Sequence, residues 1–220
     1  MRRVEPRLVA VWVAVRDPVP VTLRVWTGQQ VAATASGAVT SGNAPVATST
    51  AVTPRRFGQR LHVAVVTVEL TAPTPPLTPG QLYSYDVDVG GSGLRGLDLL
   101  RNQTSGTPRG LALGYVENRL PSFVAPPATL DQLRLAHASC RKPNGPGFDA
   151  LAWLDDRIEN TFSSADRPQQ LFLTGDQIYG DDVAACLLPM LNALAAELLG
   201  APERLRTGPN AGDTVDATLA

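Results

Sequence analysis

The feature that most constrains the fold is a change of sequence pattern at residues 121–127, where three of seven residues are proline. Before this segment, short runs rich in Val, Leu and Trp are separated by Pro and Gly, which indicates strands joined by turns. After it, apolar runs of strand length alternate with segments of helical periodicity. We therefore expect two domains, residues 1–127 and 128–220, with residues 121–127 as the linker.

The first half predicts strands at residues 8–15, 21–26, 61–70 and 82–89. In the last of these, apolar side chains at the odd positions would share one face, while Ser84, Asp86 and Asp88 share the other. Short alternating strands with Pro- and Gly-rich turns are typical of an antiparallel β-sandwich of the immunoglobulin or fibronectin type. Residues 27–60 carry no clear pattern and fit either a mobile excursion or two weak strands.

The second half predicts strands at residues 133–139 and 170–174 and helices at residues 148–162 and 183–199. This βαβα order predicts two parallel strands joined by a right-handed crossover. We expect Asp149 to cap the first helix. In the second helix, we expect Asp181 to be the N-cap and Asp182 to lie in the first turn. Pro189 should kink or split the second helix because proline lacks the backbone donor. Cys186 is expected in the core on this helix.

The carboxyl ends of the two predicted strands carry the residues that suggest a metal site. Because parallel strands end at one edge of a sheet, Cys140 and Asp176 should lie within reach of a common ion. Asp176 and Tyr179 offer hard oxygen donors, which suit a metal of high charge. The alternatives are a polar turn at Asp176, an inert buried thiol at Cys140 and an anchoring aromatic at Tyr179.

Three motifs resemble the opening of the alkaline phosphatase D-like (PhoD-like) metallophosphatases. They are Leu135-Ala-His-Ala-Ser-Cys-Arg-Lys142, Gly147-Phe-Asp-Ala-Leu151 and Leu171-Phe-Leu-Thr-Gly-Asp-Gln-Ile-Tyr179. The resemblance spans about residues 130–190, and before that it is only architectural. It implies a β-sandwich followed by the first βαβα part of a metallophosphoesterase domain, which is a layered αββα sandwich.

The same resemblance implies hydrolysis of phosphate monoesters and diesters with ferric iron and calcium. Position by position, Asp176, Tyr179 and Cys140 match metal ligands of the family, and Asp176 matches the carboxylate that bridges the metals. Arg141 and Lys142 could meet the substrate phosphate, although basic loop residues are usually only solvated. Among the two histidines, His137 is expected to pack or to support a ligand, and His62 receives no role.

The family pattern is incomplete in this sequence. Metallophosphoesterases take further His and Asn ligands from later strands, and no histidine follows Tyr179. Residues 200–220 show no strand periodicity. We therefore expect an N-terminal portion or truncated form with half a metal site and little turnover. The alternative is a noncatalytic β-sandwich that binds a partner and carries a structural α/β appendage. Nucleotide binding is disfavoured because no Gly-x-Gly-x-x-Gly or Walker loop follows either strand.

Charge and cysteine content narrow the remaining function classes. Lys and Arg total 19 and Asp and Glu total 20, so no net field attracts nucleic acid or anionic lipid. The two cysteines leave no disulfide framework and no Cys-x-x-Cys zinc site. The basic start does not lead into a signal peptide or membrane span, so we expect a cytoplasmic protein. The preference for Arg over Lys suggests a GC-rich, bacterial coding sequence.

Overall fold

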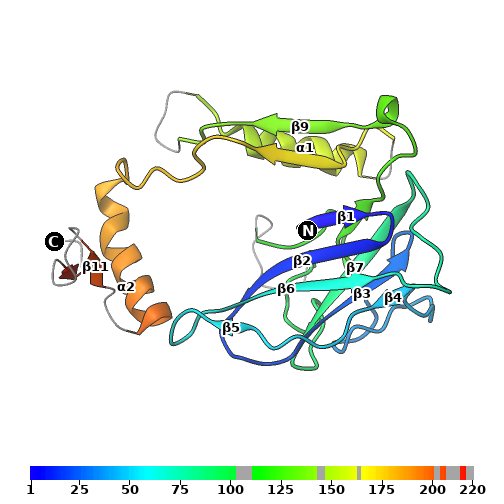
Figure 1. Ribbon diagram of the computed structural model, residues 1–220, viewed down its shortest axis with the longest axis horizontal. Helices are drawn as coiled ribbons and strands as arrows, with labels where there is room; N and C mark the ends of the chain where they lie inside the picture. The colour runs from blue at the N-terminus through cyan, green and yellow to red at the C-terminus, as the bar shows by residue number, and fades with distance from the viewer. Residues whose placement is uncertain (103–110, 143–146, 163–164, 201–203, 207–213, 217–220) are drawn as a thin grey trace.

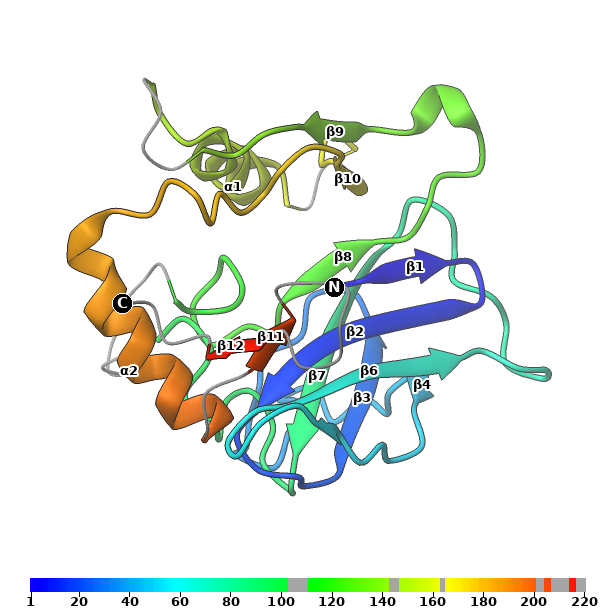
Figure 2. The ribbon, with the colours of Figure 1, turned by 60° about the vertical axis from the view of Figure 1, so that its left-hand side comes forward.

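The computed structural model describes residues 1–102, 111–142, 147–162, 165–200, 204–206 and 214–216. The fold is mixed and mostly β, with two antiparallel sheets of four strands each and few helices. Figure 1 shows these sheets as one body, here called the β unit, with β9, α1 and β10 forming a separate layer, the α/β unit. Helix α2 runs along one side from the α/β unit to the β unit, as the turned view also shows (Figure 2).

The first sheet of the β unit has the strand order β1-β2-β6-β5. Its strands are β1 (Arg3–Glu5), β2 (Leu8–Val15), β6 (His62–Glu69) and β5 (Arg55–Arg56). Alternate side chains of β2 and β6 face inward, because paired positions such as Val9 with Val68 are both buried. The cross-strand pair Trp12 and Val65 faces outward, and both side chains are about half exposed.

The second sheet has the order β4-β3-β7-β8 and packs against the first over a shared apolar core. Its strands are β4 (Ala47–Thr48), β3 (Val21–Thr27), β7 (Leu82–Val89) and β8 (Ser122–Val124). The prediction that residues 121–127 form a linker is wrong in part, since residues 122–124 form strand β8 of the second sheet. Phe123 is buried and stacks on Tyr83 with ring centroids 5.7 Å apart, so this segment belongs to the core.

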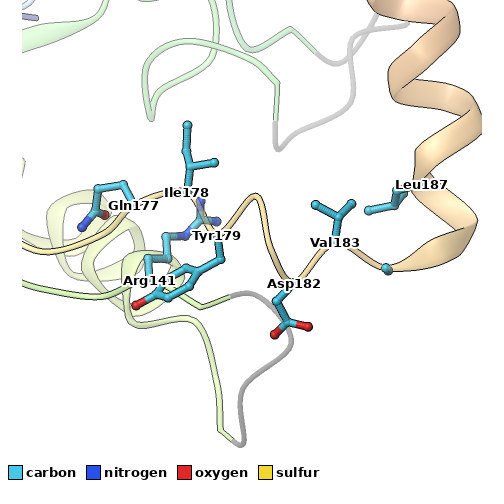
Figure 3. A pocket seen from close by; sticks show the side chains of 8 residues that line it. Arg141, Gln177, Ile178, Tyr179, Asp182, Val183 and Leu187 are labelled. Atoms are coloured by element: carbon cyan, nitrogen blue, oxygen red, sulfur yellow. The ribbon is translucent and has the colours of Figure 1, made fainter. Parts of the chain in front are cut away.

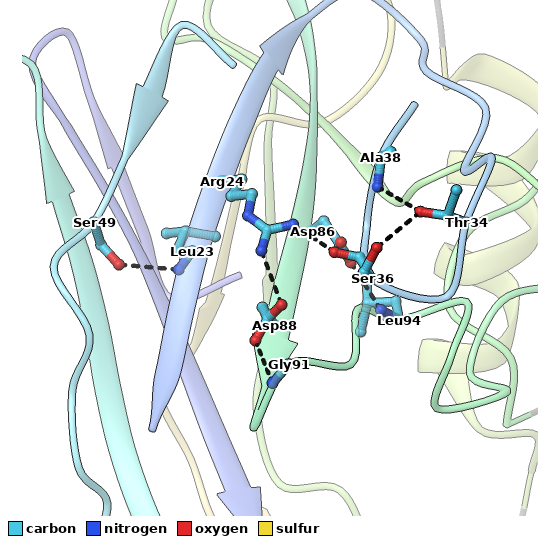
Figure 4. Close-up of polar contacts among 10 residues, drawn as sticks. All are labelled: Leu23, Arg24, Thr34, Ser36, Ala38, Ser49, Asp86, Asp88, Gly91 and Leu94. Carbon is cyan, nitrogen blue, oxygen red and sulfur yellow. Dashed lines mark hydrogen bonds and ion pairs between the residues drawn. The ribbon is translucent and has the colours of Figure 1, made fainter. Parts of the chain in front are cut away.

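Strand β7 differs from a half-exposed strand because its polar face is also buried. Ser84, Asp86 and Asp88 alternate with the apolar positions as expected, yet all three are buried. Asp88 Oδ2 accepts a hydrogen bond from Arg24 at 2.8 Å, and Asp86 Oδ1 accepts one from the Leu94 amide at 2.8 Å (Figure 4). Loops at residues 34–38 and 91–97 therefore close over this face of the second sheet.

The α/β unit has the predicted parallel pairing. Strand β9 (Leu135–Ala138) pairs with β10 (Gln170–Leu173), and α1 (Ala150–Thr161) connects them in sequence. The capping role predicted for Asp149 is confirmed, because its side chain accepts a hydrogen bond from the Leu151 amide at 3.0 Å.

Polar side chains tie the α/β unit to the β unit. Tyr115 donates a hydrogen bond to Asp155 of α1 at 2.8 Å. Arg167, which is buried, donates to the backbone oxygen of Ser122 in β8 at 2.6 Å. A polar junction of this kind resembles contacts between domains more than it resembles a shared core.

Helix α2 (Leu188–Leu199) begins later than predicted. The short 3₁₀ helix η2 (Ala185–Leu187) precedes α2. Pro189 lies in the first turn of α2, where a missing backbone donor costs little. It was expected inside the helix, where it would cause a kink, and that expectation is wrong. The roles expected for Asp181 as the N-cap and for Asp182 as an acid in the first turn are wrong, since Leu187 occupies the N-cap position of α2 and its first turn has no acidic residue. Cys186 is exposed in η2, which contradicts the core position expected for it.

The expectation that residues 200–220 lack strands is wrong. Strands β11 (Arg204–Arg206) and β12 (Thr214–Asp216) pair antiparallel, and the rest of residues 201–220 lies outside the described residues. Among the described residues, no helix is long and apolar enough to cross a membrane.

Apolar surface is left uncovered outside the β unit. No residue of β9, β10, α1 or α2 is fully buried, and Phe172 of β10 is 49% exposed. Parallel strands are normally covered on both faces. The β unit is thus the part of the described structure that has its own core.

Candidate metal centre

The carboxyl ends of β9 and β10 meet at one rim, as the parallel topology predicts. The ladder continues beyond the strands, since the Thr174 amide donates to Ala138 O at 3.1 Å and the Arg141 amide donates to Asp176 O at 2.8 Å. Cys140 therefore lies beside the Gly175-Asp176 turn despite their separation in sequence. We call residues 174–183, which follow β10, the site loop.

Gly175 allows this close approach, a role that the sequence analysis missed. A β-carbon at Gly175 would overlap Ser139 Oγ and would lie 2.7 Å from Cys140 Sγ and 2.8 Å from Cys140 N. Only glycine lets the site loop pass this near to the end of β9. The signal available in the sequence was the glycine placed directly before Asp176.

The thiol of Cys140 lies in a polar cluster. Three hydrogen bonds lower the pKa of Cys140 below its usual value: the largest effect comes from Ser139, the next from Tyr179 and the third from the backbone of Asp176. The hydrogen bond between Tyr179 and Cys140 also raises the pKa of Tyr179, because the phenol donates its proton toward the thiol. Beyond the ends of β9 and β10, the side chains of Cys140 and Tyr179 thus contact each other, and Asp176 meets them through its backbone.

The backbone of Cys140 adds a second unusual feature. Its φ of 56° lies in the left-handed region, which non-glycine residues seldom occupy. Such conformations are held by the surrounding structure and occur disproportionately at functional sites. Here the backbone hydrogen bond between Arg141 and Asp176 holds the turn.

The donor set fits a metal only in part. Asp176 and Tyr179 supply hard oxygens, and Cys140 supplies a soft sulfur that a bound ion would hold deprotonated. Across the part of the chain that the structure describes, no group of three or more His, Cys, Asp and Glu could hold a metal ion. Tyr179 is therefore the third donor that the cluster depends on, and the described residues provide an incomplete coordination shell.

Both basic residues predicted near the substrate take part in ion pairs. Arg141 pairs with the helix-capping Asp149 at 2.6 Å and lowers the pKa of that carboxyl. Lys142 pairs with Asp182 of the site loop at 2.8 Å. These pairs are about half exposed, so they are weak and an anionic ligand can compete for the cations. Arg141 also lines a hollow of about 220 Å³ beside the site loop (Figure 3).

His137 links the end of β9 to the residue that follows β10. Its Nε2 lies 2.7 Å from Thr174 Oγ1, and the side chain is exposed. The imidazole can therefore hold the end of β9 against β10. Its expected packing is not observed, whereas a supporting role for the residue remains a prediction.

Comparison with protein-family models, with curated proteins and with solved structures finds no match. The function therefore has to be inferred from the geometry of the rim itself.

Proposed function

We propose that this chain carries the first part of a metal-dependent phosphoric ester hydrolase of the PhoD-like type. In this proposal the β unit is an immunoglobulin-like sandwich, and β9, α1 and β10 begin a metallophosphoesterase αββα domain. The observation that carries the proposal is the contact between Cys140 and Tyr179, beside the backbone of Asp176, at the carboxyl ends of two parallel strands. Open α/β sheets bind their ligands at this edge.

The residues have distinct roles in this proposal. Asp176 would hold the metals, with two oxygens that can face two ions, while Tyr179 and Cys140 would bind iron. Ferric iron and calcium, when bound, would supply Lewis-acid activation of water and of a phosphate ester. Arg141 and Lys142 would exchange their carboxylate partners for the substrate phosphate, which orients the ester at the rim. Gly175 keeps the site loop close enough for the three donors to act together.

A noncatalytic role is the second candidate, and one surface feature favours it. Trp12 is 54% exposed and its cross-strand neighbour Val65 is 51% exposed on the outer face of the first sheet. Exposed aromatic and aliphatic pairs are common at binding surfaces. In this case the β unit would bind a partner and the α/β unit would be structural.

The two candidates differ in what Asp176→Asn does. A metallohydrolase loses bound iron and any hydrolysis of aryl phosphate, because the amide cannot replace the carboxylate charge. The matched control is Asp131→Asn, which removes a carboxylate from the exposed 3₁₀ helix η1 (Leu130–Gln132), remote from the cluster. Iron content that is equal in wild type and Asp176→Asn contradicts the proposed site.

A further inference from the structure

Helix α2 connects the site loop to the β unit. At its start, η2 follows directly on the site loop, and Ile178, Val183 and Leu187 line the same hollow (Figure 3). At its end, α2 meets residues 57–61, the turn between β5 and β6 that we call the hairpin tip (Figure 1). An α-helix of this length is a rigid rod of roughly 18 Å.

The hairpin tip caps the carboxyl end of α2. The Gln59 amide donates to Leu199 O at 3.2 Å and the Arg60 amide donates to Leu198 O at 2.8 Å. These bonds satisfy two carbonyls that a helix end otherwise leaves without intrahelical partners. Arg60 also pairs with Glu197 at 3.0 Å and places a positive charge at the negative end of the helix dipole.

The fit at this junction is close. A β-carbon on Gly58 would overlap Leu198 O and would lie 2.8 Å from Leu199 Cα. Both atoms belong to the helix backbone, so they cannot rotate away as a side chain can. No residue of α2 is buried, so this junction is the principal contact that the described residues give the helix body.

We propose that α2 is a strut that positions the site loop from the β unit, with Gly58 and Arg60 as its positioning residues. Displacing the capped end moves the rigid helix, and the movement reaches the loop that carries Asp176 and Tyr179. The link to metal affinity rests on the proposed function. The mechanical link between hairpin tip and site loop does not.

Amide hydrogen exchange on the metal-free, full chain tests the mechanical link. Gly58→Ala is expected to speed exchange of residues 175–187 relative to wild type. Gly96→Ala is the matched control, because its β-carbon would lie 2.5 Å from Ala35 O inside the β unit and away from α2. Equal exchange of residues 175–187 in the two variants overturns the proposal.

A charge reversal provides a second route should Gly58→Ala fail to fold. Arg60→Glu is expected to speed exchange of the same residues, and adding Glu197→Arg should restore it. A double variant no slower than Arg60→Glu contradicts the role of Arg60.

Ferric iron binding separates the two proposals. Gly58→Ala should weaken iron binding about tenfold, as loss of support around ligands does, and Gly96→Ala should not. If the wild type binds no iron through Asp176 but the exchange result holds, the strut stands and the proposed function fails. If iron binds and residues 175–187 exchange alike in both glycine variants, the strut is refuted.

Discussion

Asp86 makes a testable contribution to the stability of the β unit, because its carboxyl is fully buried and only partly satisfied. Oδ1 accepts the Leu94 amide, whereas Oδ2 has no hydrogen-bond partner among the described residues. Gly37 and Gly93 approach Oδ2 so closely that a β-carbon on either would overlap it. Burial is the main cause that raises the pKa of Asp86, and it outweighs the attraction of Arg24.

The sign of the pH dependence follows from this raised pKa. The folded state holds the proton more tightly than the unfolded chain, so Asp86 destabilises the fold increasingly as pH rises from 3.8 through the folded pKa. Asp86→Asn keeps the acceptor for Leu94 and removes the buried charge. An unsatisfied buried polar group costs about 1–3 kcal/mol, so Asp86→Asn should be more stable than wild type by about this amount at neutral pH.

Urea unfolding across pH 3–8 measures the difference. The stability gain of Asp86→Asn should shrink as the pH falls through the folded pKa toward 3.8, and below 3.8 it should stay constant because both states of the wild type are protonated. Asp88→Asn is the matched control on the same face of β7, and it should lose about 1–3 kcal/mol because it leaves Arg24 without its carboxylate. A wild type that is more stable than Asp86→Asn at pH 7 would refute the reasoning.

Two further predictions concern the metal-site cluster and the core. Tyr179→Phe removes a hydrogen bond that lowers the pKa of Cys140, so the pKa of Cys140 should rise. Alkylation of its thiolate near neutral pH should therefore slow, and an unchanged pH profile of alkylation contradicts the hydrogen bond between Tyr179 and Cys140. Leu23→Ala in the β-unit core should cost about 2–5 kcal/mol of unfolding free energy, whereas Leu171→Ala in exposed β10 should cost much less. Chemical denaturation measures both losses, and similar values would contradict the exposure of β10.

The sequence predicted the elements whose pattern is local. Val9, Val11 and the matching positions of β6 alternate in the period of a strand, so β2 and β6 were recognised with nearly the observed bounds. Strand β8 was missed because its flanking prolines indicated a linker, while the burial of Phe123 depends on Tyr83 far away in sequence. Residues 27–60 contain β4 and β5 of two residues each, too short to leave a pattern.

Only the part of the candidate site that follows from the strand topology could be predicted. Parallel strands end at the same edge of a sheet, and this predicted that Cys140 lies near Asp176. The burial of Asp86 was not predictable, because two loops from elsewhere in the chain close over it. The docking of α2 on the hairpin tip was missed for the same reason: it joins residues that lie far apart in sequence and is made largely through backbone atoms.

Ferric iron binding by the purified chain tests the central claim most directly. The protein is loaded with ferric iron, dialysed, and examined for iron content and for the visible absorption of an iron-bound phenolate. We predict iron in the wild type, loss of the absorption in Tyr179→Phe, and reduced iron in both Asp176→Asn and Cys140→Ser. Iron content that is the same in all four proteins contradicts a metal centre at the ends of β9 and β10.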